Sequence, residues 1–78
     1  MKNFIVNFKE ITDVENFVKI AEDFDFEIIL SQGKYSVDGK SLMGIFSLDI
    51  TKPVDISINS EDTSSSNTFM EKIKKYIA

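Results

Sequence analysis

Ser41 is the side chain whose position most directly indicates chemistry, because it stands directly before a short apolar run. At the start of a helix, an N-cap serine accepts a hydrogen bond from a backbone amide of the first turn, which contributes about 1 kcal/mol. Phosphorylation of the same hydroxyl would add about −1.5 to −2 units of charge near unpaired amide groups. Lys40, the preceding residue, offers a cation beside it. The residues alone favour the simple cap and leave modification open.

The apolar run after Ser41 is the second candidate site, and it indicates protein docking. Leu42, Met43, Ile45 and Phe46 lie within five residues of one another. A helix this short cannot bury four large side chains, so we expect Met43 and Phe46 to stay partly exposed. Methionine suits docking surfaces, because its flexible side chain adapts to different partners. The alternative is that most of these side chains belong to the core.

The absent residue types exclude most catalytic chemistry. The chain has no histidine and no cysteine, so it has no imidazole base, no phosphohistidine and no thiolate nucleophile. All nine basic residues are lysines, which removes the bidentate arginine fork used in phosphate recognition. Asp23, Asp25 and Glu27 lack the spacing of a calcium loop. We therefore expect no enzyme activity, no metal site and no cofactor.

Length, charge and hydropathy indicate one small domain over residues 1–78. Hydrophobic residues make up 42% of the chain and seven are phenylalanines, which is enough for one core. The net charge of −4 disfavours binding to nucleic acid or to anionic membranes. No stretch has the pattern of a signal peptide or the length of a membrane span. We expect a cytoplasmic protein that does not insert into membranes.

Alternation of apolar and polar residues predicts four strands. They lie at residues 4–8, 27–30, 35–37 and 54–58. The second and third are separated by a turn at residues 32–34, so we expect a hairpin. With the helices below, the order is β-α-β-β-α-β-α.

Helical spacing predicts three helices. The first starts at Thr12, whose spacing to Glu15 is that of a capping box. The second covers residues 42–48 behind the cap at Ser41. Residues 60–68 are polar and serine-rich, and the run of serines at residues 64–66 is expected to form a loop that leads into the third helix. The apolar face of the third helix is formed by Phe69, Ile73, Tyr76 and Ile77.

Residues 39–48 read Gly-Lys-Ser-Leu-Met-Gly-Ile-Phe-Ser-Leu. They resemble the Lys-Ser-Ile-Met-Gly-Val-Met-Ser-Leu block of HPr, the phosphocarrier protein of the bacterial sugar phosphotransferase system. The resemblance continues into the hairpin before this block and the strand after it. It implies an α+β fold: an open-faced sandwich in which a four-stranded antiparallel sheet carries three helices on one face.

The resemblance also implies roles for single residues. In HPr, the serine that matches Ser41 is phosphorylated by a regulatory kinase. The apolar residues after it form an exposed patch that docks partner enzymes and a transcription regulator. The expected docking residues are Lys40, Leu42, Met43, Ile45 and Phe46.

The phosphorylated histidine of HPr has no counterpart here. In HPr it belongs to a Gly-Ile-His-Ala-Arg-Pro motif before the first helix, where backbone amides and the helix dipole stabilise the phosphoryl group. Residues 8–13 take that place, with Glu10 at the position of the histidine and Thr12 at that of the arginine. Glu10 has three interpretations: a solvated acid stabilised by the helix dipole, a permanent imitation of the phosphoryl charge, or an acceptor that forms an acyl phosphate.

Three functions follow from the resemblance, and the first is preferred. A regulatory or adaptor protein would keep the Ser41 helix and lack the carrier step, like the catabolite-repression HPr paralogues that lack the histidine and keep the serine. Its partners would be phosphotransferase-system components, a serine kinase or a transcription regulator. The alternatives are a phosphoryl acceptor that uses Glu10 or Ser41, and a degenerate HPr-like domain with a structural role.

Overall fold

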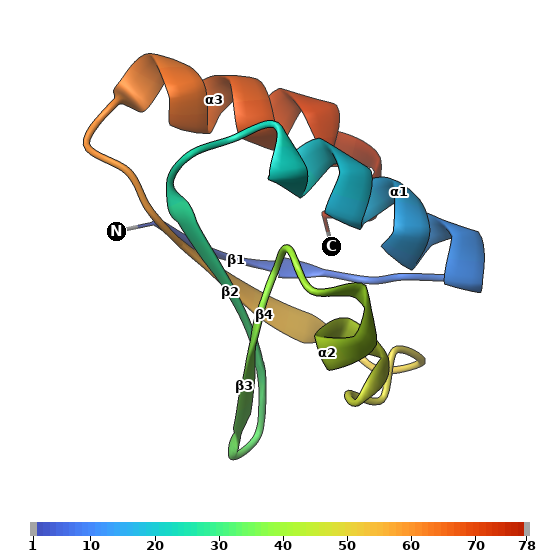
Figure 1. The fold of residues 1–78 in the computed structure, drawn as a ribbon. Helices are drawn as coiled ribbons and strands as arrows, with labels where there is room; N and C mark the ends of the chain where they lie inside the picture. Colours follow the sequence, from blue (N-terminus) through green and yellow to red (C-terminus); the bar gives the residue numbers. More distant parts are fainter. Residues whose placement is uncertain (1, 78) are drawn as a thin grey trace.

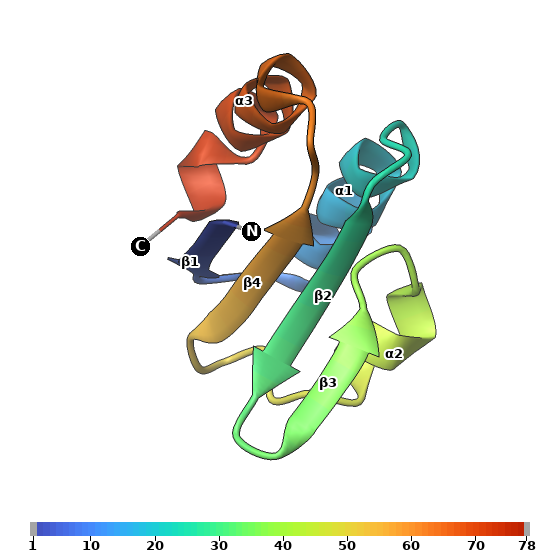
Figure 2. The ribbon, with the colours of Figure 1, turned by 90° about the vertical axis from the view of Figure 1, so that its left-hand side faces the viewer.

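The computed structural model describes residues 2–77, which follow the predicted order of strands and helices (Figure 1). The strands form one antiparallel sheet in the order β1-β4-β2-β3. Figure 2 faces the open side of this sheet, with the helices behind and above it. The elements are β1 (Lys2–Val6), α1 (Ile11–Glu22), β2 (Glu27–Gln32), β3 (Tyr35–Asp38), α2 (Leu42–Phe46), β4 (Val54–Asn59), α3 (Thr63–Lys72) and the 3₁₀ turn η1 (Lys74–Tyr76).

The two faces of the sheet differ as the period of two requires. On β4, Val54, Ile56 and Ile58 are buried against the helices, and Asp55 between them is exposed. The register pairs Ile56 with Phe4 on one side and with Leu30 on the other, so apolar residues line one face across the sheet. The fold is therefore the predicted four-stranded α+β sandwich with helices on one face only.

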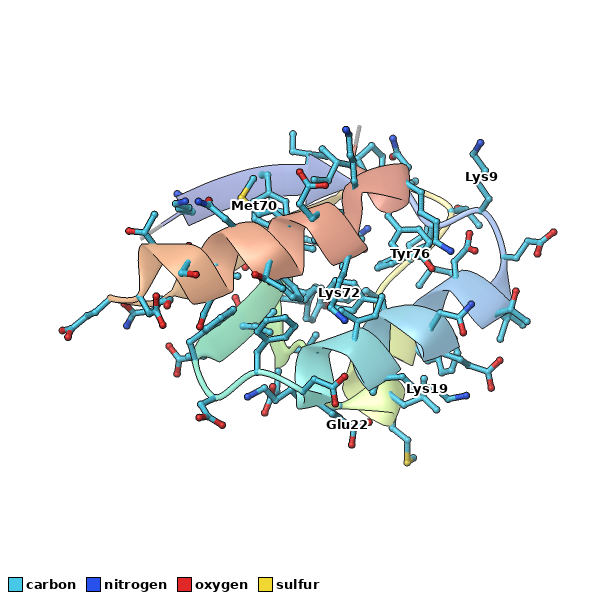
Figure 3. The ribbon with its side chains drawn as sticks, turned by 90° about the horizontal axis from the view of Figure 1, so that it is seen from above. Lys9, Lys19, Glu22, Met70, Lys72 and Tyr76 are labelled. Carbon is cyan, nitrogen blue, oxygen red and sulfur yellow. The ribbon has the colours of Figure 1, made fainter. Side chains whose placement is uncertain are left out.

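Aromatic rings join the two long helices above the sheet. Phe17 of α1 lies edge-on to Phe69 of α3 with 5.9 Å between ring centroids, and edge-on to Phe8 at 5.5 Å. Phe24 and Phe26 approach Phe69 at 5.3 and 5.7 Å. Each such pair contributes about 0.5–1.5 kcal/mol beyond the burial of its area. Figure 3, seen from above, shows α1 and α3 side by side over this layer.

Helix α1 begins at Ile11, so the predicted start at Thr12 is wrong. Glu10 is the N-cap, and the carboxylate of Asp13 accepts hydrogen bonds from the backbone N–H of Glu10 at 3.2 Å and from that of the preceding residue at 2.9 Å. The Thr12 hydroxyl donates to the Glu10 carboxylate at 3.2 Å instead of capping the helix. Two capping boxes overlap in the sequence, Glu10 with Asp13 and Thr12 with Glu15. The first one forms, and its Asp13 carboxylate accepts from two backbone N–H groups.

The serine-rich segment is helical, which corrects its prediction as a loop. Helix α3 begins at Thr63 behind the N-cap Asp62, whose carboxylate accepts from the backbone N–H groups of Ser64 at 3.0 Å and Ser65 at 3.3 Å. Hydrogen bonds from Ser65, first from its hydroxyl, hold the pKa of Asp62 below its ordinary value of 3.8. Ser66 is buried one turn before Phe69. The cap and this burial outweigh the low helix propensity of serine.

The predicted C-terminal helix is divided into α3 and η1. Phe69, Ile73 and Tyr76 are buried as expected, although α3 ends at Lys72. The Tyr76 carbonyl then accepts from the N–H of Asn7 at 2.7 Å, and Ile77 forms an antiparallel bridge with Val6. The end of the described chain therefore lies along the outer edge of β1.

Candidate functional site

A tight turn carries the chain from β3 to Ser41. The N–H of Gly39 donates to the Ile28 carbonyl at 2.7 Å, and a Cβ on residue 39 would lie only 2.5 Å from Cγ2 of Ile28. Only glycine allows this close approach. Asp38 then accepts from the next two amides, through its carboxylate from Lys40 at 2.9 Å and through its carbonyl from Ser41 at 3.0 Å.

Ser41 is the N-cap of α2, as predicted. Its hydroxyl oxygen accepts from the N–H of Gly44 at 3.1 Å, and its carbonyl accepts from Ile45 at 3.0 Å. A Cβ on residue 44 would lie 3.0 Å from the Ser41 hydroxyl oxygen and 3.4 Å from Cβ of Val37. Gly44 thus leaves room for the cap, which explains a glycine inside a short helix.

Helix α2 presents one apolar face to solvent. Met43 is 84% exposed, Phe46 39% and Leu42 36%, whereas Ile45 is completely buried. Successive residues are rotated by about 100° around a helix axis, so the three exposed side chains fall within one arc of about 100°. We call Leu42, Met43 and Phe46 the docking patch.

The burial of Ile45 corrects its assignment to the docking residues. Ile45 lies on the side of α2 that packs into the core, so it holds the helix in place and is not part of the exposed face. Lys40 is half-buried beside the cap. The helix also ends at Phe46 and not at residue 48, because the Ser47 hydroxyl and N–H both donate to the Gly44 carbonyl.

The chain that leaves α2 is held by Gln32, which the sequence placed in a turn without a role. Its side-chain amide donates to the Asp49 carbonyl at 2.7 Å and accepts from the Asp49 N–H at 2.8 Å. Hydrogen bonds from Thr51, first from its hydroxyl, lower the pKa of Asp49. Gln32 lies two residues after Leu30 and four after Ile28, and both of these side chains face the core. The same alternation in the sequence could have indicated that the Gln32 side chain points to that face.

Glu10 lies on a different helix from Ser41, at the N-terminus of α1. Its exposed carboxylate accepts from the Thr12 hydroxyl, and the Asp13 carboxylate occupies the backbone donors of Lys9 and Glu10. Two carboxylates therefore stand where the helix dipole would attract an anion. An incoming phosphoryl group would meet two negative charges, and the backbone N–H groups of Lys9 and Glu10 are already in use.

Ile11 is an exposed apolar residue that the sequence did not single out. It is the first residue of α1 and 62% exposed, on a helix that contacts α2. Its spacing of three and seven residues to buried Val14 and Val18 is that of the apolar face, so the sequence pattern gave no signal of its exposure.

Within residues 2–77, no helix is long and apolar enough to cross a bilayer. The same residues contain no group of three or more histidine, cysteine, aspartate or glutamate side chains that could hold a metal ion.

The sheet, its one-sided helix layer and the serine-capped helix α2 define the class: a small open-faced α+β sandwich that presents a capped apolar helix. The family model PTS-HPr, described as the PTS HPr component phosphorylation site, matches residues 13–78. The protein therefore belongs to the HPr family of the phosphotransferase system. The match begins after Glu10, the residue that we predict to take the position of the family's phosphorylated histidine.

Solved structures show the same fold. HPr-C-His from Thermoanaerobacter tengcongensis is 23% identical with a TM-score of 0.77, and the alignment covers 96% of this chain and 92% of that one. The phosphocarrier protein HPr from Bacillus anthracis str. Ames is also 23% identical, with a TM-score of 0.71 and coverage of 99% and 94%. No curated protein matches the chain.

The cap geometry predicts the effect of replacing Ser41. Ser41→Ala removes the acceptor of the Gly44 N–H, so we expect the free energy of unfolding to fall by about 1 kcal/mol. Ser41→Asp keeps a good N-cap acceptor and should stay within about 0.5 kcal/mol of the wild type. Urea denaturation followed by far-ultraviolet circular dichroism measures both values. Equal stability of the alanine variant and the wild type would show that the cap contributes nothing.

Proposed function

We propose that this protein is a regulatory or adaptor member of the HPr family, which docks partner proteins through α2 and lacks the histidine carrier step. The observation that carries the proposal is the docking patch, three large apolar side chains on one exposed face of a five-residue helix. Contiguous apolar surface on a small domain commonly marks an interaction site. The expected partners are phosphotransferase-system proteins, a serine kinase or a transcription regulator in the cytoplasm, and not nucleic acid or membranes.

The patch is fixed before any partner arrives. Ile45 is fully buried beneath it, Ser41 caps its N-terminal side, and Gln32 makes two hydrogen bonds to Asp49 beyond its C-terminal side. A surface that is already ordered loses little conformational entropy on binding. This supports docking as a rigid face.

The surroundings of Glu10 argue against the phosphoryl-acceptor alternative. Asp13 places a second carboxylate within one turn, and the chain has no arginine to offset the charge of a phosphoryl group. Glu10 is better explained as the N-cap of α1. The pair of carboxylates also gives α1 a permanent negative charge at its start.

Modification of Ser41 is the regulatory part of the proposal. The hydroxyl lies directly before the docking patch, so a phosphoryl group there would add negative charge at the edge of an apolar surface. The adjacent Lys40 offers a counter-charge, whereas the Asp38 carboxylate, bonded to the Lys40 amide, opposes it. Phosphorylation would therefore alter the choice of partner mainly through the added negative charge, and less through a change in the shape of the docking patch.

Met43→Asp tests the docking patch. A charge at the most exposed position of the patch should raise the Kd for a partner by at least about tenfold, because an unpaired carboxylate would be buried in the complex. The partners to test are an HPr serine kinase and the general phosphotransfer enzyme, by isothermal titration calorimetry. The melting temperature should stay unchanged, since Met43 is 84% exposed.

Tyr35→Asp is the matched control, because Tyr35 is 72% exposed and lies on β3 outside the patch. It should leave the Kd unchanged. Equal affinity of Met43→Asp and wild type would refute docking through the patch. Failure of the wild type to bind either protein would favour the structural role.

An HPr serine kinase with ATP should add one phosphate to the protein at Ser41. The hydroxyl is half-buried and bonded to the Gly44 amide, so we expect slower modification than of an HPr that is treated in parallel. Intact mass and fragment spectra identify the site, and Ser41→Ala is the control. No added phosphate while the parallel HPr is modified would remove regulation at Ser41 from the proposal.

Phosphoenolpyruvate and the general phosphotransfer enzyme should leave the protein unmodified, because it has no histidine. A histidine-containing HPr in the same reaction shows that the enzyme is active. A hydroxylamine-labile phosphate that disappears in Glu10→Gln would instead establish the acyl-phosphate alternative. That result would overturn the absence of a carrier step.

A further inference from the structure

We propose that Met43 is a site of selective, reversible oxidation by hydroperoxides, and that its sulfoxide switches the docking patch off. The inference rests on the proposed docking function. Among residues 2–77, Met43 is the most exposed of the large hydrophobic side chains. It lies with Leu42 and Phe46 on the exposed arc of α2, so the more accessible of the two sulfurs within residues 2–77 belongs to the surface proposed for binding.

The other described methionine is less exposed. Met70 lies on α3, where Figure 3 labels it, and it is half-buried. Its surroundings include Lys74 and Ile77, which line the same shallow hollow. Met43 has no comparable cover. A reagent in solution therefore reaches the Met43 sulfur more readily than that of Met70.

The reaction needs no catalytic group from the protein. A lone pair of the Met43 sulfur attacks one oxygen of the hydroperoxide, and the O–O bond breaks as the S–O bond forms. The leaving oxygen takes up a proton and departs as water or as an alcohol. The sulfur is oxidised, the peroxide is reduced, and methionine sulfoxide reductases reverse the change.

Oxidation would change the surface and spare the fold. The sulfoxide is polar and a strong hydrogen-bond acceptor, so burying it against an apolar partner surface leaves an acceptor unpaired. Met43 is absent from the core, which is held by residues such as Ile45 and Leu48. The free protein therefore keeps its structure while the patch loses the most exposed of its three apolar side chains.

Peptide mapping tests selectivity without any partner. The protein is treated with hydrogen peroxide for increasing times, quenched, and cleaved after glutamate. Met43 then lies in residues 28–61, Met70 in residues 62–71 and Met1 in residues 1–10, so each is followed separately by mass spectrometry. We expect Met43 to react at least about threefold faster than Met70, in line with its greater exposure. Equal rates, or faster reaction of Met70, would overturn the proposed selectivity.

Binding tests the switch. The Kd for the HPr serine kinase and for the general phosphotransfer enzyme is measured before and after peroxide, and again after methionine sulfoxide reductases. Oxidation should raise the Kd by at least about tenfold, and reduction should restore it. The ratio of the Kd after oxidation to the Kd before oxidation should stay near one in Met43→Leu, which has no sulfur at position 43. The same ratio should remain large in Met70→Leu.

The outcomes separate the two proposals. Untreated protein that binds neither enzyme refutes the docking function and with it the switch, while the peptide map still decides selectivity. Untreated protein that binds, with an unchanged Kd after oxidation mapped to Met43, refutes the switch alone. A loss of circular dichroism on oxidation would show that the effect is unfolding and would refute the switch as well.

Discussion

Helix α2 depends on one buried side chain, because five residues are too few for a helix to be stable alone. Ile45 supplies that burial, and the hydrogen bonds around Ser41 and Gln32 hold the two ends. With the single inward position filled by Ile45, the other large side chains must face solvent. The exposed patch is thus a consequence of the helix length, and its orientation is fixed by the same residues that make the helix stable.

The N-terminus of α1 carries its own acids at the end of the helix dipole that attracts negative charge. The Asp13 carboxylate accepts from the backbone N–H groups of Lys9 and Glu10, directly before the helix, and Glu10 adds a second negative charge. A helix start that satisfies itself in this way gains stability from its own acids. The same two negative charges oppose the approach of a further anion to this end of the helix.

Strands and core were predictable, because a period of two and a single apolar face determine which residues point inward. Val54, Ile56 and Ile58 are examples. The phase of α2 was not predictable, since a run of four apolar residues around Gly44 does not say which one is buried, and Ile45 was misassigned for that reason. The prediction for the start of α1 was wrong, because both Thr12 and Glu10 can serve as a helix cap. Helix length required only that some of the four stay exposed, and the expected exposure of Met43 and Phe46 is confirmed.

Ser41, the N-cap of α2, and Met43 within the helix contribute to the fold to different degrees. The Ser41 hydroxyl is a cap, so any modification of it acts on the helix as well as on the surface charge. Met43 contributes almost nothing to the fold, so its chemistry is free to change without cost to stability. A domain of this size has little stability to spare. A modification that leaves the Ser41 cap intact therefore costs less stability. The exposed thioether of Met43 is a position at which a modification would leave that cap intact.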